Sequence, residues 1–394
     1  MTGAATTGAA TTGADRAVAA ALADGFLAGR WTRPELIERG RRVLGARPPW
    51  LSPLVSTVLR AYRVAPLDRP REFARFIAAT ARFRVAAAAA RRRGRPLRAR
   101  ERPVRPTGTV RSRWDTPLLD DLAGLATFLG LTDDELDWYA DRRWLNRHAG
   151  DAALHHYDYT WLPGRLIEAP KARLRALHRR LLTELFGRIP VHDAVHGFVP
   201  GRSAHTFAAA HAGRATVIRV DLTSFFASVT APRVYGMLRT AGYPEPVAHT
   251  LAALCTTRTP AAVVRAASAR LPQRAYRQAL LRQPHLPQGA PTSPVLANLC
   301  GYRLDRRLAG LAAAFDVGYT RYADDLAFSG DLSGPRARTL VARVGTIAAQ
   351  EGFRAHPAKT RIRGQGDRQL LAGLVVNHRP AVPRREYDQL RAIL

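Results

Sequence analysis

Lysine is almost absent from this sequence: of the 61 basic residues only Lys171 and Lys359 are lysines, and the other 59 are arginines. Cysteine is equally scarce, because only Cys255 and Cys300 occur. Without a CxxC spacing, the sequence predicts neither a disulfide framework nor a zinc site. No apolar run approaches the roughly 18 residues of a membrane span, and the N-terminus lacks a basic-then-apolar signal pattern. We therefore expect a cytoplasmic protein that does not cross a membrane.

Acidic residues are also in short supply, since 31 acids stand against 61 bases and leave a formal charge of +30. A surplus of this size is the footprint of a protein that binds a polyanion, and nucleic acid is the natural candidate. A genome that favours arginine codons would explain many arginines, but it explains the surplus of charge less well. The two lysines are of interest because an ammonium can lose its proton near neutral pH, whereas a guanidinium is effectively always protonated. The alternative explanation is that these two lysines have no special role and remain by chance.

The composition changes along the chain and suggests how it is organised. Residues 1–15 are a low-complexity repeat that cannot bury a core, so we expect a disordered tail. Residues 16–90 predict a helical N-terminal module, which includes one continuous helix over 71–90. Residues 91–113 form a Pro-punctuated basic linker with ten arginines and a single acid, Glu101. We interpret this linker as an arm that contacts nucleic-acid phosphates, with a solvated tether as the alternative.

Two helix starts carry capping-box patterns, in which a Ser or Thr at the N-cap and a Glu three residues later satisfy each other's backbone amides. One pattern is Thr32 with Glu35, and the other is Thr132 with Glu135. We expect a helix to begin at each.

Two adjacent carboxylates, Asp324 and Asp325, lie between two β-rich segments in residues 318–329. Neighbouring side chains on a strand point to opposite faces, so both acids reach one site only at a hairpin turn. Like charges held together there repel each other, and Mg²⁺ would remove the difficulty because it takes carboxylate oxygens and keeps positions for phosphates. An exposed acidic turn is the alternative. A predicted buried strand over 216–222 contributes Asp221, and three carboxylates suit a two-metal site for phosphoryl transfer.

At this point the residues carry a family resemblance. The strings VDLTSFF, LPQGAPTSP and YADD, in that order, resemble the palm motifs of reverse transcriptases. HGFVPGRS lies just upstream and KTRI downstream, as the family pattern implies. Within this superfamily the chain most resembles the bacterial retron type, over about residues 116–377. The resemblance implies a right-hand polymerase with an α+β palm and fingers over 114–377, a helical N-terminal extension and little or no thumb. Residues 378–394 would be the start of a truncated thumb or a C-terminal tail.

The resemblance also implies the catalytic groups. Asp221 and Asp324 would be the principal ligands of two Mg²⁺ ions, with Mn²⁺ as the alternative ion, and the carbonyl of Leu222 would complete one of them. Asp325 would be a partial or outer ligand. Lys359 would act as a general acid toward the leaving pyrophosphate.

Further residues match the substrate contacts of the family. Phe226 would be the residue that rejects a 2′-OH on the sugar, and His211 is interpreted as a structural histidine. A second basic residue is expected just before the fingers arginine, Arg165, and is absent here. The expected nucleotide contacts are Arg165, Phe226, Gln288 and Gly289, and the expected template and primer contacts are Lys171, Gly201, Arg202, Ser203 and Tyr322.

The resemblance implies an RNA-directed DNA polymerase that uses dNTPs. Its template and primer would be a cognate, structured non-coding RNA, and its product DNA. A partner effector protein and a role in phage defence are further implications. Two alternatives stay open: a group II intron-type or other bacterial reverse transcriptase, and an RNA-binding protein whose polymerase core is inactive.

Overall fold

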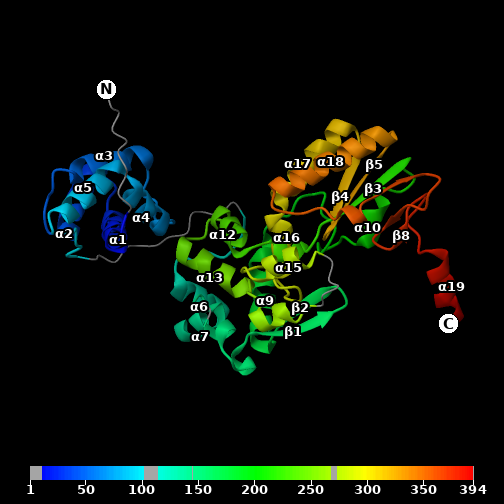
Figure 1. The fold of residues 1–394 in the computed structure, drawn as a ribbon, viewed down its shortest axis with the longest axis horizontal. Coiled ribbons are helices and arrows are strands. Elements are labelled where there is room, and N and C mark those ends of the chain that lie inside the picture. The colour runs from blue at the N-terminus through cyan, green and yellow to red at the C-terminus, as the bar shows by residue number, and fades with distance from the viewer. Residues whose placement is uncertain (1–10, 102–113, 144, 268–272, 394) are drawn as a thin grey trace. The chain divides into compact units, whose positions relative to one another are not determined.

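The computed structural model describes residues 11–101, 114–143, 145–267 and 273–393 (Figure 1). The chain forms two compact units. This division differs from the predicted boundary near residue 113, because two later segments belong with the N-terminal unit. The first unit comprises Met1–Ser112, Leu118–Phe128 and Arg239–His249, and the second comprises Arg113–Pro117, Leu129–Leu238 and Thr250–Leu394.

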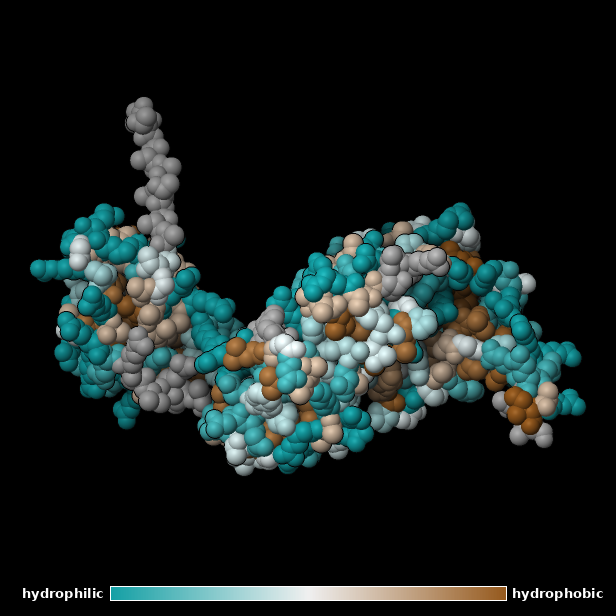
Figure 2. All heavy atoms as spheres, turned by 60° about the horizontal axis from the view of Figure 1, so that its bottom comes forward, coloured by the Kyte–Doolittle hydropathy of each residue, from teal (hydrophilic) through white to brown (hydrophobic). Residues whose placement is uncertain are grey.

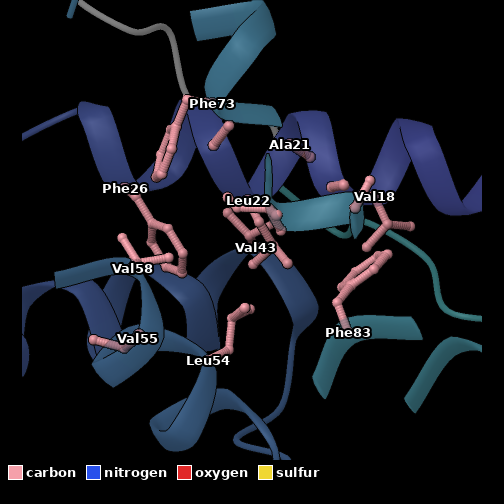
Figure 3. Packing of buried hydrophobic residues seen from close by; sticks show 14 of the residues in the cluster. Val18, Ala21, Leu22, Phe26, Val43, Leu54, Val55, Val58, Phe73 and Phe83 are labelled. Atoms are coloured by element: carbon pink, nitrogen blue, oxygen red, sulfur yellow. The ribbon is translucent and has the colours of Figure 1, made fainter. Parts of the chain in front are cut away.

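The N-terminal module is helical, as the sequence predicts. Its core is entirely apolar and is built around Leu22, Phe26 and Phe73, which are fully buried (Figure 3). The ring of Phe73 packs at a tilted angle on Phe26 and edge-on against Tyr62, arrangements that aromatic pairs prefer. The helices that surround this core are α1 (Gly13–Leu27), α2 (Arg33–Leu44), α3 (Leu51–Ala61), α4 (Pro70–Ala79) and α5 (Ala81–Arg92).

Helix α1 begins inside the predicted disordered tail, and this corrects the predicted boundary at residue 15. Thr12 caps the helix in a capping box with Asp15. Asp15 is buried and forms an ion pair with Arg91 of α5. The tail prediction therefore fails for its last residues because they have a cap and a buried charge partner. Residues 1–10 lie outside the described part of the chain.

Two further predictions in this module are wrong. The helix expected over 71–90 is divided at Thr80, whose extended backbone ends α4 and whose side chain caps α5 by accepting a hydrogen bond from Phe83 N. Thr32 precedes α2 but makes no capping hydrogen bond, so the expected box with Glu35 does not form. Glu35 instead pairs with Arg39 one turn along the helix.

The first part of the predicted basic linker packs on the N-terminal module, and its contact with nucleic-acid phosphates stays a prediction. Leu97 and Ala99 lie against its apolar core, and Arg100 N donates to Val43 O at 2.7 Å. The remainder of the linker, residues 102–113, lies outside the described residues.

The second unit opens with short helices and a hairpin. At Thr132 the predicted capping box with Glu135 is confirmed. The strands β1 (Tyr157–Leu162) and β2 (Arg165–Pro170) pair antiparallel around Pro163 and Gly164. Helix α6 (Leu122–Leu129) belongs almost wholly to the first unit. The helical elements of the second unit up to β3 are α7 (Asp133–Ala140), α8 (Leu145–His148), η1 (Ala152–Leu154), α9 (Ala172–Glu184), η2 (Phe186–Arg188) and α10 (Ala204–Ala209).

A four-stranded antiparallel sheet in the order β4-β5-β3-β6 forms the centre of the second unit (Figure 1). Helices α17 (Tyr302–Phe315) and α18 (Gly334–Gln350) pack against it. The strands are β3 (Thr216–Asp221), β4 (Gly318–Tyr322), β5 (Asp325–Gly330) and β6 (Arg361–Gly364). The other elements are α11 (Phe225–Ser228), α12 (Ala231–Thr240), α13 (Glu245–Cys255), α14 (Ala261–Arg265), α15 (Arg274–Leu281), α16 (Ser293–Cys300), η3 (Pro357–Lys359), β7 (Leu370–Leu371), β8 (Leu374–Val375) and α19 (Arg384–Ile393).

The two faces of this sheet differ in chemistry, because side chains alternate along a strand. Ile218 and Val220 of β3 are buried on one face. Arg219 and Asp221 lie on the other face, beside a small apolar cluster formed where α10 and the β7–β8 hairpin pack on the sheet. The polar face therefore carries the acids that the sequence singles out.

Among the described residues, no helix is both long and apolar enough to cross a membrane. The face of the molecule in Figure 2 interleaves hydrophilic and hydrophobic side chains.

Candidate active site

The adjacent acids lie at a hairpin turn, as predicted. Strands β4 and β5 pair so that Tyr322 lies opposite Asp325, which leaves Ala323 and Asp324 as the turn. Ala323 has φ +54°, a left-handed conformation that is uncommon for a residue with a side chain. Leu222 N donates to Asp324 O at 2.8 Å and ties the turn to the end of β3.

A glycine in the neighbouring loop, Gly197, allows this loop to approach the turn. A Cβ at position 197 would lie 2.5 Å from the backbone nitrogen of Ala323. The loop is also hydrogen-bonded along β4, since His196 N donates to Arg321 O and Arg321 N donates to Ala194 O, both at 2.7 Å. The HGFVPGRS string therefore supports the turn through Gly197, a residue that the sequence analysis did not single out.

A fully buried ion pair lies beneath the hairpin. Arg321 donates to both carboxylate oxygens of Asp305, at 2.7 and 2.6 Å. The same guanidinium donates to Ala323 O at 3.1 Å and to Asn298 Oδ1 at 3.0 Å. Breaking such a pair would leave an uncompensated buried charge. The Arg321–Asp305 pair therefore holds the interior side of the turn in place.

Asp221 lies directly opposite Asp325 across β3 and β5, and only 4% of its surface is exposed. Lys359 Nζ donates to Asp221 Oδ2 at 3.0 Å. The lysine side chain is half exposed, so its ammonium contacts both the buried carboxylate and solvent.

Asp325 has a different partner. Arg219 donates from Nε and from its terminal nitrogen to the two carboxylate oxygens of Asp325, each at 2.8 Å. Burial raises the pKa of Asp325, and the Arg219 guanidinium opposes this rise. The two adjacent acids therefore occupy unlike environments, one at the turn and one in a bidentate ion pair.

The pKa of Asp324 is raised to about 6, first by burial and then by the negative charges of Asp325 and Asp221. Lys359 offsets part of this rise. A divalent cation would remove the repulsion, and two carboxylates with the Leu222 carbonyl are the hard oxygen donors that Mg²⁺ takes. These donors fit an open metal site. Within the described ranges, no group of three or more His, Cys, Asp or Glu side chains is placed to hold a metal ion. The candidate metal site therefore takes two carboxylates and a carbonyl.

A cavity of about 470 Å³, which we call the carboxylate cavity, is lined by Asp221 and Asp324. It brings together residues that lie far apart in the sequence and that the resemblance implies for catalysis or nucleotide binding. Those that line it are Arg165, Asp221, Leu222, Phe226, Gln288, Asp324 and Lys359.

Three residues of this cavity were missed by the sequence analysis. Thr223 has a buried hydroxyl without a hydrogen-bond partner among the described residues, and this polar atom lies at the edge of the site. Arg277 of α15 donates to Gly164 O in the β1–β2 turn and supplies a second guanidinium beside Arg165. Phe198 is half exposed at φ +60°. Thr223 and Phe198 lie in recognised strings, whereas nothing in the sequence around Arg277 marks it.

Aromatic rings follow one wall of the cavity. The ring of Phe198 lies 6.2 Å from that of Phe226 and 6.3 Å from that of Tyr322. Tyr322 also packs against the apolar cluster under α10. Phe226 is partly exposed and thus free to face a ligand in the cavity.

The LPQGAPTSP turn is attached to β2. Glu168 N donates to Gln288 O at 2.8 Å. Gly289 has φ +134°, and a Cβ there would lie 3.0 Å from Glu168 O. The close approach that this glycine allows is therefore to the backbone of β2. The Glu168 carboxylate is buried and accepts from Thr259 at 2.7 Å.

The expected template and primer contacts make bonds within the protein. Lys171 Nζ donates to the carbonyls of Ala152 and Ala153, at 3.0 and 3.2 Å. Arg202 donates to two carbonyls of the preceding loop, and Ser203 caps α10. Gly201 has φ +75° and open space around it.

His211 is fully buried between two hydroxyls, with Nδ1 2.7 Å from Ser329 Oγ and Nε2 2.7 Å from Thr320 Oγ1. Burial lowers its pKa to about 4. This neutral ring joins β4 to β5, in agreement with a structural role.

Comparisons with known proteins agree with this geometry. Residues 164–371, more than half of the chain, match the reverse transcriptase (RNA-dependent DNA polymerase) family. The chain is 41% identical over 312 residues to the retron Mx65 reverse transcriptase of Myxococcus xanthus, covering 76% of this chain and 68% of that protein. It is 41% identical over 300 residues to the retron Mx162 enzyme of the same organism, covering 70% and 58%.

A third relative, the retron Ec86 reverse transcriptase of Escherichia coli, is 30% identical over 231 residues, covering 58% of this chain and 63% of that protein. The chain thus spans about three fifths to two thirds of the length of these relatives. The match over the palm motifs, together with an acidic hairpin turn facing a cavity, shows that the chain belongs to the reverse transcriptases, the RNA-directed DNA polymerases, among those of the bacterial retron type.

Proposed function

We propose that this protein synthesises DNA on a structured non-coding RNA by two-metal nucleotidyl transfer. The observation that carries the proposal is the shared cavity, in which Asp221 and Asp324 face Arg165, Phe226 and Gln288. Acidic and basic side chains surround one space of about 470 Å³. This arrangement suits a triphosphate bound with divalent ions.

Asp221, Asp324 and the Leu222 carbonyl would hold the ions, with Asp325 outside them on Arg219. When bound, Mg²⁺ would activate the primer hydroxyl and neutralise charge on the departing pyrophosphate. Repulsion among the three acids, which contributes to the raised pKa of Asp324, supports a cation at this place.

The other residues of the cavity have complementary roles in the proposal. Arg165 and Arg277 would bind the triphosphate, because planar guanidiniums suit phosphate oxygens. Phe226 would lie under the sugar and exclude a 2′-OH. Lys359, held by Asp221, would supply a proton to the pyrophosphate.

The formal charge of +30 supports a nucleic-acid template. The relatives are named as retron reverse transcriptases, which supports a cognate non-coding RNA as template and primer. A partner effector and a role in phage defence complete the proposal.

The test is extension of a primed RNA template by the purified protein with dNTPs and Mg²⁺. Asp221→Asn and Asp324→Asn each remove one ligand charge at nearly constant volume, so each should abolish extension while circular dichroism shows a folded protein. Arg338→Gln on α18, which is exposed, serves as the control and should extend normally. Undiminished extension by either Asn variant would contradict the metal assignment.

A further inference from the structure

Four arginines converge on one hollow beside the carboxylates, which we call the arginine hollow. It is lined by Arg219, Arg361, Arg363, Arg368 and Leu370 and has a volume of about 330 Å³. No acid lines it.

The antiparallel register of β3 and β6 builds this hollow. Arg219 lies directly opposite Arg361, and Arg363 lies two residues further along β6. Side chains directly opposite on neighbouring strands have Cβ atoms roughly 5 Å apart, and like charges there are destabilising. Residues two apart share a face, so Arg219, Arg361 and Arg363 lie on the face that carries Asp221.

Among the described residues, Arg219 has the closest carboxylate partner, Asp325, at 2.8 Å. Arg363 lies 3.8 Å from Asp367, and both side chains are about half exposed. Arg361 donates to the backbone carbonyls of Ala358 and Thr360.

Arg368 has neither a side-chain hydrogen bond nor an ion pair to another described residue, and its side chain is exposed. The repulsion built in by the register is therefore compensated by a close carboxylate at Arg219 and, across 3.8 Å and half exposed to solvent, at Arg363. Arg361 and Arg368 have no carboxylate partner among the described residues. An anion bound in the hollow would compensate these two.

We propose that the arginine hollow binds a backbone phosphate of the nucleic-acid strand whose end lies at Asp221 and Asp324. The inference rests on the proposed function, because it takes the carboxylate cavity as the place where a strand ends. Guanidinium forks bind phosphate oxygens in a bidentate manner, and several around one hollow favour a phosphate over a carboxylate.

The spacing supports a strand over a free nucleotide. Arg219 precedes Asp221 by two residues on β3, about 7 Å along a strand. Phosphates recur every ~3.4 Å of axis along one nucleic-acid strand. A strand that ends at the carboxylates would therefore bring a phosphate to the hollow within a few nucleotides. The free triphosphate has its own cations, Arg165 and Arg277, in the larger cavity.

The experiment compares Arg363→Gln/Arg368→Gln with a control that removes the same charge elsewhere. Both targets lie away from the carboxylate cavity. The control, Arg306→Gln/Arg338→Gln, changes exposed residues of α17 and α18 that do not line the hollow. Fluorescence anisotropy gives the Kd of a labelled RNA-template/DNA-primer duplex over a range of KCl concentrations, and single-turnover extension gives the apparent Kd of the dNTP.

The hollow variant should bind the duplex more weakly than the control, and its plot of log Kd against log[KCl] should be shallower by about 1 for each arginine removed. The dNTP affinity should not change. Arg363→Lys/Arg368→Lys keeps the charges and should retain most of the salt dependence, which separates lost phosphate contacts from a damaged fold.

The inference is overturned if the hollow variant binds the duplex with the affinity and salt dependence of the control. It is also overturned if only dNTP affinity falls, since the hollow then holds a free triphosphate. Failure of the wild-type protein to extend any primer would count against the proposed function. If the wild-type protein extends primers but the hollow variant binds the duplex as the control does, the phosphate site is wrong and the proposed function still holds.

Discussion

Lys359 and Asp221 are joined by a hydrogen bond of 3.0 Å between Nζ and Oδ2, although 138 residues separate them in the chain. The bond places an ammonium at the rim of the carboxylate cavity. It also means that a cation already compensates Asp221 before any metal binds. Position 359 therefore bears on both metal binding and proton transfer.

Replacing Lys359 with Arg should slow catalysis without removing the charge. The guanidinium can still pair with Asp221, but it cannot easily release a proton. Loss of a general acid typically costs ~10²–10⁴-fold, and single-turnover incorporation would measure it. Lys171→Arg is the matched control, because the side-chain bonds of Lys171 to other described residues are to two backbone carbonyls, and its replacement should change the rate little. Equal rates for Lys359→Arg and wild type would rule out the general acid.

Phe226→Ala should admit ribonucleotides, because it opens space beneath the sugar in the cavity. The ratio of rNTP to dNTP incorporation efficiency should rise by about 10- to 200-fold, the range by which one small group in a pocket changes discrimination. Phe225→Leu is the control, since Phe225 borders the same cavity but is buried and stacks on Phe353. An unchanged ratio in Phe226→Ala would make this ring a core residue.

Asp324 should give the metal-free protein a distinct pH dependence. The unfolded carboxyl loses its proton near pH 3.8, whereas burial and the neighbouring acids keep it on the folded protein up to about pH 6. The folded state thus binds more protons in this window, and stability falls as pH rises through it. Two pKa units correspond to roughly 2–3 kcal/mol.

Asp324→Asn carries no titrating group at this position and should escape the loss. Urea unfolding of both proteins in EDTA, between pH 4 and pH 7, would give the difference in unfolding free energy. This difference should grow in favour of the variant as pH rises. Added Mg²⁺ should raise the unfolding free energy of the wild type more than that of the variant. A difference that does not vary with pH would contradict the raised pKa.

Gly197→Ala should impair catalysis by displacing the turn that carries Asp324. Its Cβ would meet the Ala323 backbone at 2.5 Å, and backbone atoms cannot swing aside as a side chain can. A misplacement of about 1 Å can cost ~10²-fold in rate. Gly345→Ala, at an open position of helix α18, should be neutral or up to about 1 kcal/mol more stable. Normal single-turnover rates in Gly197→Ala would show that the loop can adjust.

The sequence by itself predicted where the acids of the candidate site lie in the fold. Adjacent acids between two β-rich segments require a hairpin turn, because strand side chains alternate between faces, and Asp324 is found at that turn. The buried strand that ends at Asp221 could be predicted from its β-branched residues. The capping box at Thr132 could be predicted from the spacing of Thr132 and Glu135. These features are local, so the residues that decide them are neighbours in the chain.

The tertiary structure alone decided which partner each acid receives. Asp325 lies bidentate on Arg219, 106 residues away, and Asp305 supports the turn through Arg321. The break at Thr80 and the ordered start of α1 at Thr12 also depend on cap and packing contacts that the local pattern did not resolve. Local patterns state that a charge is buried but not which distant side chain meets it. That choice is made by strand register and loop docking, which bring together residues that the sequence keeps far apart.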